Sequence, residues 1–418
     1  MKNKRKIAII LCTVLVAAVT VSAVVMFKKP SQTAPKYVFL FIGDGMGLAH
    51  ASAADSYLAY EDGGKLGGGY LTFTGFPVTG LCRTWCNNSS VTGSAASGTA
   101  IACGEKTDVG HLGTSSQGDS LRSIAYDLRD LGYKVGIMSD GPVNHATPAA
   151  FYAHVQKRNA CYDISKEIPA TGFDFFGGSE IIDRYGKHHD QEDVVKYIEA
   201  DGNCDVCFGK AELEKSTAKT KVFLPENPED EEDFDSKDTN KDYDLSMAGL
   251  GLQAADFVEA CLEDFGDSSP FFIMCEQGYV DWACHRNSTR RMLESVFQLD
   301  RAVKKAYEFY LEHPDETLII VTSDHETGGF AFGVKNYETR WDEFDKWWEE
   351  CGHDDSSLTP EENAQVNSRC SVGWACGNHT GCPVPVYALG CGAERFTGFY
   401  ENSDLKSKIL GVAPKMNK

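Results

Sequence analysis

The sequence predicts an α/β fold in which a mostly parallel central sheet is covered by helices on both faces. Short runs rich in Val, Ile and Phe are candidate strands, and longer stretches between them have helical periodicity. The candidate strands are 37–42, 135–138, 271–275, 318–322 and 386–389. The candidate helices are 120–131, 245–264 and 290–311. Strands that alternate with helices are typical of parallel sheets with both faces buried.

Acidic residues at the ends of these strands provide a further observation. They are Asp44, Asp140, Glu276 and Asp324, each next to the end of a candidate strand. Open α/β sheets bind ligands at the carboxyl ends of their strands. We therefore expect one cleft to gather residues that are distant in the sequence.

The N-terminus has the pattern of an export signal. Residues 1–6 are mostly basic, residues 7–27 form an apolar run, and Lys28 and Lys29 close it. The run is long enough to span a bilayer, and residues 21–23 resemble a cleavage site, so a cleaved signal peptide and a retained membrane anchor are the two alternatives. We expect residues 1–35 to be this segment with a linker, and residues 36–418 to form a periplasmic or extracellular domain.

Charge excludes one class of partner. The 418-residue chain has a formal net charge of -21, whereas a nucleic-acid surface needs clustered Lys and Arg. A phosphate substrate is not excluded, because bound metal ions and one arginine can reverse the field inside a cleft.

Fifteen cysteines are present, and one of them, Cys12, lies in the apolar run. The remaining even number favours disulfide bonds in an exported chain. The local pairs that we consider are Cys82 with Cys86, Cys204 with Cys207, and Cys370 with Cys376. Metal binding or redox chemistry at residues 204–207 is the alternative for that pair.

Two stretches are predicted to be insertions, at about 200–245 and 330–375. Residues 225–244 are rich in Asp and Glu, which predicts a solvated loop. Residues 238–249 superficially resemble a calcium loop but lack its glycine at the sixth position and its glutamate at the twelfth. Residues 330–371 of the second insertion contain three tryptophans, and we expect this stretch to form a flap or small subdomain over the cleft.

Six short motifs carry residues suited to metal and phosphate chemistry. They are GDGMG at 43–47, VTGSAAS at 91–97, HATP at 145–148, EQGYVDWACH at 276–285, SDHETGG at 323–329 and NHTG at 378–381. Together and in this order they resemble the alkaline phosphatase family, over about 36–392 apart from the insertions. The resemblance implies hydrolysis of phosphate monoesters through a phosphoserine, with two Zn²⁺ and a third metal that is normally Mg²⁺.

Ser94 is the candidate nucleophile. It opens a helix of small residues at 94–102, where the helix N-terminus would stabilise an attached phosphate. The alternative is an ordinary N-cap serine, and the resemblance implies the nucleophile. Gly93 departs from many relatives, which have aspartate there, so we expect a looser hold on the phosphate-binding arginine.

Arg158 is the candidate for that arginine. It lies 11 residues after Thr147, which matches the family's spacing. A guanidinium fork can bind two phosphate oxygens at once. A solvated helix charge is the alternative for Arg158 and for its neighbour Lys157.

Two residue sets are candidates for zinc. Asp281 and His285 are four residues apart, so one helical turn can present both to a metal, and a buried polar pair is the alternative. The resemblance adds His379 to form the first zinc site. For the second zinc site it implies Asp44, Ser94, Asp324 and His325.

The third metal set is Asp44, Thr147 and Glu276, with His145 in place of the aspartate that some bacterial relatives have. Oxygen ligands suit Mg²⁺. Trp282 occupies a position where other members have lysine or histidine. We expect an imidazole near the third metal site to weaken the preference of that site for Mg²⁺ or to admit another divalent ion, which leaves the identity of this metal open.

Rival enzymes on related scaffolds fit the motifs less well. Diesterases typically use threonine as nucleophile, sulfatases need a Cys/Ser-x-Pro-x-Arg context, and phosphosugar mutases are cytoplasmic. An inactive surface protein is the rival from another class, although every nucleophile and ligand position is filled. The resemblance also implies small phosphate monoesters as substrates, inorganic phosphate as product and inhibitor, and a homodimer.

Overall fold

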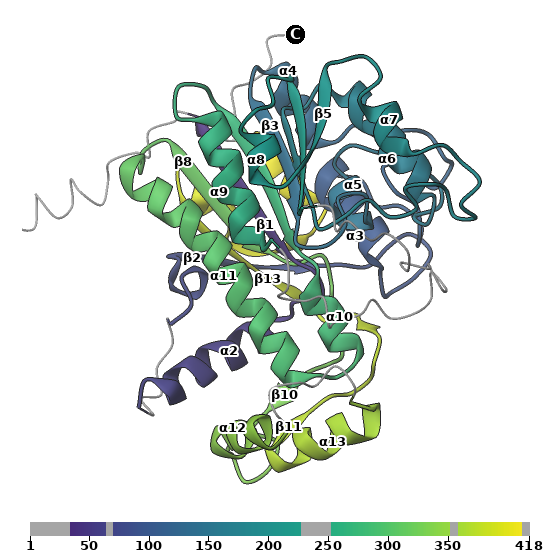
Figure 1. Ribbon diagram of the computed structural model, residues 1–418. Helices are drawn as coiled ribbons and strands as arrows, with labels where there is room; N and C mark the ends of the chain where they lie inside the picture. The colour runs from purple at the N-terminus through teal and green to yellow at the C-terminus, as the bar shows by residue number, and fades with distance from the viewer. Residues whose placement is uncertain (1–33, 64–69, 227–251, 352–357, 412–418) are drawn as a thin grey trace, which may run out of the picture.

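A ten-stranded sheet with helices on both faces forms the centre of the molecule, which confirms the predicted fold class (Figure 1). The computed structural model describes residues 34–63, 70–226, 252–351 and 358–411. The predicted signal or anchor at 7–27 and the calcium-like loop at 238–249 lie outside these residues. Among the residues that the structure describes, no helix is long and apolar enough to cross a membrane.

Nine of the ten strands run in one direction. In spatial order they are β14 (Gly398–Glu401), β2 (Val78–Arg83), β13 (Val384–Gly390), β8 (Thr317–Thr322), β1 (Tyr37–Gly43), β7 (Phe271–Gln277), β3 (Lys134–Ser139), β4 (Phe175–Gly177), β6 (Thr220–Leu224) and β5 (Cys204–Phe208). β13 pairs antiparallel with both of its neighbours, and the other pairs are parallel. All five predicted strands are present in this sheet.

Helices cover each face of the sheet. The helices of the described residues are α2 (Leu48–Glu61), α3 (Ser94–Cys103), α4 (Ile124–Asp130), α5 (Ala146–Ala149), α6 (Cys161–Thr171), α7 (Val194–Ile198), α8 (Lys210–Leu213), α9 (Ala254–Phe265), α10 (Tyr279–His285), α11 (Thr289–Glu312), α12 (Trp341–Glu350), α13 (Pro360–Arg369) and α14 (Asp404–Leu410). Figure 1 shows α9 and α11 in front of the sheet. The helices α3, α4, α5, α6 and α14 contribute to the core on the opposite face.

The central strand β1 shows why two cores form. Its alternate residues belong to different apolar clusters: Tyr37 and Phe39 pack on the side of α2, α9 and α11, whereas Val38 and Leu40 pack on the other side. Every residue of β1 is buried. Because successive side chains of a strand point to opposite faces, a strand covered on both sides must be apolar throughout.

The observed helices refine the predicted ranges. α4 begins at Ile124 rather than at 120, because Ser120 forms a β-bridge with Thr114 and Ser123 is the N-cap. α9 begins at Ala254, where Gln253 and Asp256 form a capping box. Residues 245–251 of that prediction lie outside the described part of the chain.

The second predicted insertion forms a small lobe at the end of α2 and α11 (Figure 1). It contains α12, α13 and a two-stranded pair of β10 (Ala331–Phe332) with β11 (Val372–Gly373). Tyr57 of α2 packs edge-on against Trp341 and Phe344 of α12. This aromatic contact fixes the lobe to the main body.

The predicted disulfides are not confirmed. In the described ranges, the fourteen cysteines from Cys82 to Cys391 are free thiols. Cys204 and Cys207 both lie on β5 but belong to the clusters on opposite faces of the sheet. Residues three apart on a strand point in opposite directions, so neither a disulfide nor a shared metal fits this pair.

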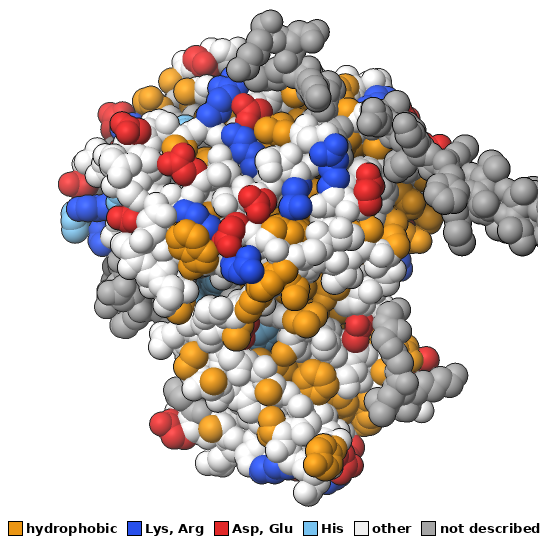
Figure 2. Space-filling view, turned by 180° about the vertical axis from the view of Figure 1, so that it is seen from behind, with side chains coloured by type: hydrophobic (Ala, Val, Ile, Leu, Met, Phe, Trp, Pro, Cys, Tyr) orange, Lys and Arg blue, Asp and Glu red, His pale blue; other side chains and the backbone are white. Residues whose placement is uncertain are grey.

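One face of the molecule carries charges of both signs, and the absence of a nucleic-acid partner stays a prediction. On the face seen in Figure 2, Lys and Arg side chains are interspersed with Asp and Glu over the main body. A nucleic-acid surface would show Lys and Arg gathered on one face.

Candidate active site

The predicted site residues converge at the carboxyl edge of the sheet. The strands β8, β1, β7 and β3 are consecutive neighbours. Asp324, Asp44 and Asp140 follow three of them, and Glu276 is the penultimate residue of β7. All four carboxylates are buried. Parallel neighbours therefore bring together acidic residues that are up to 280 positions apart (324 minus 44).

The first group of potential metal ligands is formed by Asp281, His285 and His379. Asp281 and His285 lie one turn apart on α10, with Nε2 of His285 3.1 Å from Oδ2 of Asp281. Nε2 of His379 lies 3.6 Å from Oδ1 of Asp281 and 3.2 Å from Nε2 of His285. The three side chains thus point ligand atoms at a common centre, as predicted for the first zinc.

Backbone carbonyl groups orient the two histidines of this group. Nδ1 of His285 lies 2.8 Å from the carbonyl oxygen of Gly377, and Nδ1 of His379 lies 2.9 Å from that of Thr92. A hydrogen bond from Nδ1–H to a carbonyl leaves Nε2 as the metal-binding atom.

His379 reaches the site through a two-stranded pairing outside the main sheet. It lies on β12 (His379–Thr380), which pairs antiparallel with β9 (Glu326–Thr327). The pairing aligns His379 with Thr327, two residues after His325. As a result, the rings of His325 and His379 stack with their centroids 3.7 Å apart.

The second group surrounds Nε2 of His325. Oδ1 of Asp44 and Oδ2 of Asp324 each lie 3.3 Å from this atom, and so does Oγ of Ser94. Asp44, Asp281 and His325 also qualify together as a potential metal-binding group. The structure therefore places the predicted nucleophile among the ligands predicted for the second zinc.

The third group contains Asp44, His145 and Glu276. Oγ1 of Thr147 donates to Oδ2 of Asp44 at 3.4 Å, which places Thr147 beside the same centre. The hydroxyl of Ser139, at the end of β3, donates a hydrogen bond to Oε2 of Glu276. Asp44 belongs to both the second and the third group, in agreement with its place in both predicted sets.

Unpaired oxygen atoms indicate that these groups suit cations. Oδ1 of Asp44, Oε1 of Glu276 and Oδ2 of Asp324 are buried and lack a hydrogen-bond partner. Leaving such atoms unpaired costs about 1–3 kcal/mol each, and more when they are charged. A divalent cation would satisfy all three. The histidines and carboxylates of the first two groups suit zinc, and the oxygen-rich third group suits a harder ion.

Burial and mutual repulsion perturb the carboxylates. Burial, followed by the charges of Asp324 and Asp281, raises the pKa of Asp44 well above its usual value. Burial and the nearby Asp281 raise the pKa of Asp324 to about 7. Each shift reflects the cost of placing negative charges together in a low-dielectric site, a cost that a bound cation would remove.

The imidazoles and Asp281 behave differently. Burial and the positive charge of Arg158 lower the pKa of His145 to about 3, so this ring is neutral at physiological pH. Burial and the neighbouring His379 lower the pKa of His325. Burial opposes ionisation of Asp281, but the hydrogen bond and charge of His285 overcome it and lower its pKa. Neutral imidazoles and ionised carboxylates are the forms that bind metals.

Ser94 is the first residue of α3 rather than its N-cap. The N-cap is Gly93, whose backbone is extended and which offers no side-chain cap. Ser94 is buried, and Gly104 ends the helix in the left-handed conformation at φ 77°. Ser94 is therefore not an ordinary capping serine, and the helix N-terminus is left to stabilise an anion.

Arg158 points into the site. Its Nη2 donates to Nε2 of His145 at 2.8 Å. It lies in a turn, not on a helix, and its neighbour Lys157 is exposed. The solvated-helix alternative is therefore wrong for Arg158. Through this contact the guanidinium adjoins the third group.

Some side chains that organise the site were not predicted. Thr327 donates to Oδ1 of Asp281 at 2.5 Å and lies 3.3 Å from Nδ1 of His325, so it connects two groups. Glu326 accepts hydrogen bonds from Gly329 and Thr380, which joins the two short strands. Both residues lie within the SDHETGG motif, but their spacing gives no signal of these partners.

Comparison with known proteins agrees with this geometry. A family model described as alkaline phosphatase matches residues 35–195 and 254–414. The chain belongs to the alkaline phosphatase family. Membership supports hydrolysis of phosphate monoesters as the reaction class. The interruption at 196–253 includes the first predicted insertion, of which residues 204–224 form β5, α8 and β6 at one sheet edge.

Relatives come from bacteria and animals. Alkaline phosphatase 4 of Bacillus subtilis (strain 168) is 26% identical over 427 residues, covering 92% of this chain and 90% of the relative. The human tissue-nonspecific isozyme is 27% identical and covers 73% of this chain and 66% of its own length. The solved alkaline phosphatase of the Antarctic bacterium TAB5 is 27% identical, with a TM-score of 0.71. The match covers 91% of this chain and 98% of the TAB5 chain.

Proposed function

We propose that this alkaline phosphatase family member hydrolyses phosphate monoesters through a phosphoserine formed on Ser94. The observation that carries the proposal is the position of Ser94. It is the first residue of α3, and its Oγ lies 3.3 Å from Nε2 of His325. A serine there can attack phosphorus while the helix N-terminus faces the phosphoryl oxygens.

The reaction comprises two displacements at phosphorus. Oγ of Ser94 forms a bond to phosphorus as the bond to the alcohol oxygen breaks, and the alcohol leaves with a proton. Water then attacks phosphorus, the bond to Ser94 breaks, and inorganic phosphate is released. Arg158 binds the non-bridging oxygens with its two-pronged guanidinium. Phosphate, the product, is expected to inhibit by occupying the same place.

Two Zn²⁺ and one further divalent ion fit the three groups. Asp281, His285 and His379 would hold the first zinc, and Asp44, Ser94, Asp324 and His325 the second. Bound metals would supply Lewis acidity that ionises the serine hydroxyl and water and neutralises charge on the oxygens at phosphorus. Stacking of His325 on His379, and the hydrogen bonds from His285 and His379 to backbone carbonyl groups, hold the ligand atoms in place before a metal binds.

The third ion is proposed to be divalent, either Mg²⁺ or a softer ion, held by Asp44, Glu276 and Thr147, with His145 adjoining. A TAB5 alkaline phosphatase mutant, in which a histidine is replaced by glutamate, is described with Mg bound in its M3 site. An imidazole at position 145 would favour a softer ion. Metal analysis showing only magnesium in the third site would contradict that preference.

Three further proposals follow from the sequence and the family. The N-terminal pattern supports export, with residues 7–27 as a signal or a membrane anchor. Family resemblance supports a homodimer. Recognition that stops at the phosphoryl group supports small phosphate monoesters in general as substrates.

The test compares hydrolysis of a chromogenic phosphate monoester with the matching diester and sulfate, with zinc and magnesium and then with chelator. We expect a strong, chelator-sensitive preference for the monoester. Ser94→Ala should lose most turnover while it retains zinc, whereas Ser52→Ala, at a half-buried position of α2 outside the site, should match the wild type. Preference for the diester or sulfate would refute the substrate class. Normal turnover and burst kinetics in Ser94→Ala would exclude Ser94 as nucleophile.

A further inference from the structure

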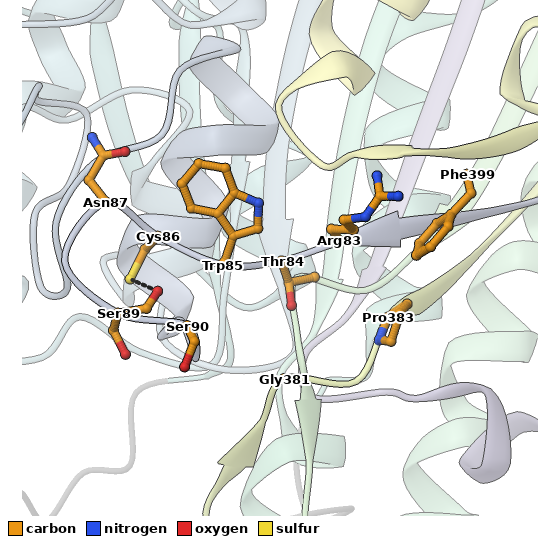
Figure 3. Close-up of a pocket in the computed structure, with 10 residues that line it drawn as sticks. All are labelled: Arg83, Thr84, Trp85, Cys86, Asn87, Ser89, Ser90, Gly381, Pro383 and Phe399. Atoms are coloured by element: carbon orange, nitrogen blue, oxygen red, sulfur yellow. Dashed lines mark hydrogen bonds between the residues drawn. The ribbon is translucent and has the colours of Figure 1, made fainter.

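A cavity of about 680 Å³ lies beside the site but outside its metal groups. Figure 3 shows Trp85 and Phe399 on either side of Arg83 and Thr84. These residues come from the carboxyl end of β2, the loop after it, and the edge strand β14. The mechanism above assigns none of them a role.

The cavity adjoins the loop that carries the nucleophile. Ser90 lines it, and the four residues from there to Ser94 span at most about 14 Å. Gly381 lines it as well, two residues after His379. The hydrogen bond from Nδ1 of His379 to the carbonyl oxygen of Thr92 ties these two segments together. The cavity is therefore next to the first metal group.

Sheet register gives independent evidence that the cavity lies close to the metal ligands. Only β13 lies between β2 and β8, so those two strands are about 10 Å apart. Tyr387 of β13 is level with Val321, and Val384 is level with Cys82. Continuing the register, Cys82 is level with Asp324. The cavity thus opens at the same edge and height as the metal ligands.

The walls of the cavity are aromatic and cationic. Trp85 is 42% exposed and Phe399 is 50% exposed, unlike most large apolar side chains of the molecule. Nζ of Lys106 lies 4.7 Å from the Trp85 ring, and the Arg83 guanidinium lies 3.9 Å from the Phe399 ring. Hydroxyls and an amide of the 84–90 loop complete the lining. Such walls suit a flat ring with polar edges.

We propose that this cavity binds the base of a nucleoside 5′-monophosphate whose phosphate lies at Ser94. The inference rests on the proposed function. The strands that lead to the cavity and to Asp324 are about 10 Å apart, and the ribose of a nucleotide is a spacer between phosphate and base. A phenyl phosphate carries its ring directly on the ester oxygen and has no such spacer. Trp85 is the stacking surface, and Phe399 forms the facing wall.

The test measures kcat/KM of the metal-loaded full chain for adenosine 5′-monophosphate and for glycerol 3-phosphate. Trp85→Ala should lower the ratio of the two values by roughly 5-fold to 100-fold, the range for loss of one base–aromatic stack. Trp85→Phe keeps an aromatic ring and should retain most of the ratio. Tyr197→Ala, which removes an exposed aromatic side chain of α7, is the matched control and should not change it.

Binding of adenosine, measured by calorimetry, gives a second readout that needs no turnover. It should be detectable in the wild type and lost in Trp85→Ala. An unchanged kcat/KM ratio in Trp85→Ala overturns the subsite. If that variant also sediments as a monomer when the wild type is a dimer, Trp85 is a subunit contact instead. A wild type that hydrolyses neither ester would instead refute the proposed function.

Discussion

Individual carboxylates in the site are poised between protonation and metal binding. Asp44, Glu276 and Asp324 each bury an oxygen with no hydrogen-bond partner. Burial raises the pKa of all three carboxyl groups, and neighbouring carboxylates raise it further at Asp44 and Asp324. A proton and a cation are alternative ways to relieve the same repulsion, so the two compete.

Zinc affinity should therefore rise with pH. Below about pH 7 Asp324 holds a proton in the metal-free protein, and zinc must displace it, so affinity falls as pH falls. Chelator competition between pH 6 and 8 measures this dependence. Asp324→Asn should bind zinc more weakly and with a flatter pH dependence. An affinity that is constant across this range would contradict the competition.

Arg158 provides a second test at the scale of one side chain. Arg158→Ala should weaken inhibition by phosphate by about 1.5–3 kcal/mol, the range for hydrogen bonds to charged groups. Lys157→Ala is the matched control, because Lys157 is adjacent, has the same charge and is exposed. Equal phosphate inhibition in Arg158→Ala and the wild type would remove this arginine from the site.

Residue identities were more predictable than residue partners. The motifs indicated the members of each metal group because Asp, His and Glu at strand ends are chemically distinctive. They did not indicate that Thr327 would join Asp281 to His325, or that Arg158 would contact His145. Such contacts depend on distances across the fold that local spacing does not encode.

At the scale of elements, α10 is held by a neighbouring strand. Asp140, which follows β3, accepts hydrogen bonds from the backbone N–H groups of Gly278 at 2.5 Å and Tyr279 at 3.4 Å. Gln277 donates to the same carboxylate. These donors belong to the N-terminus of the helix that carries Asp281. Asp140 therefore positions the first metal group without touching it.

Replacing Asp140 should disturb that helix. Asp140→Asn has one acceptor oxygen and turns an amide N–H₂ toward a donor, which costs about 1–3 kcal/mol. We expect a lower Tm and weaker zinc binding at the group of Asp281 and His285, measured by thermal unfolding and zinc titration. Asp163→Asn on exposed α6 is the control. Wild-type zinc affinity in Asp140→Asn would show that the contact does not position α10.

The element order was predictable in part. Buried strands such as β1 and β8 are continuous apolar runs, and the long amphipathic α11 was found within one residue at each end. The strand β2 and the edge strand β14 were missed because only some of their residues are buried. Pairing between β9 and β12 was also missed, because two-residue strands carry no periodicity.

At the scale of the whole molecule, the metal site joins segments from most of the chain. A cation that binds only the folded state stabilises it by mass action, by about 2.7 kcal/mol at 100 times its Kd. Chelation should therefore lower the Tm, and added zinc should restore it. The raised carboxyl pKa values make the metal-free fold lose stability as pH rises toward 7. The difference in Tm between the metal-bound and the chelated protein should therefore be larger at pH 8 than at pH 6. Calorimetric scans with and without chelator measure it. A Tm unaffected by chelator would contradict metal-linked stability.

The single reversed strand has a consequence for how the protein is made. Because β13 runs against the other nine strands, its first residue lies at the edge where the parallel strands end, and His379 comes just before it. The remaining metal-group residues precede it in the chain. A growing polypeptide shorter than 379 residues therefore lacks the last ligand of the first group. Completion of that group must wait until nearly all of the chain has been synthesised.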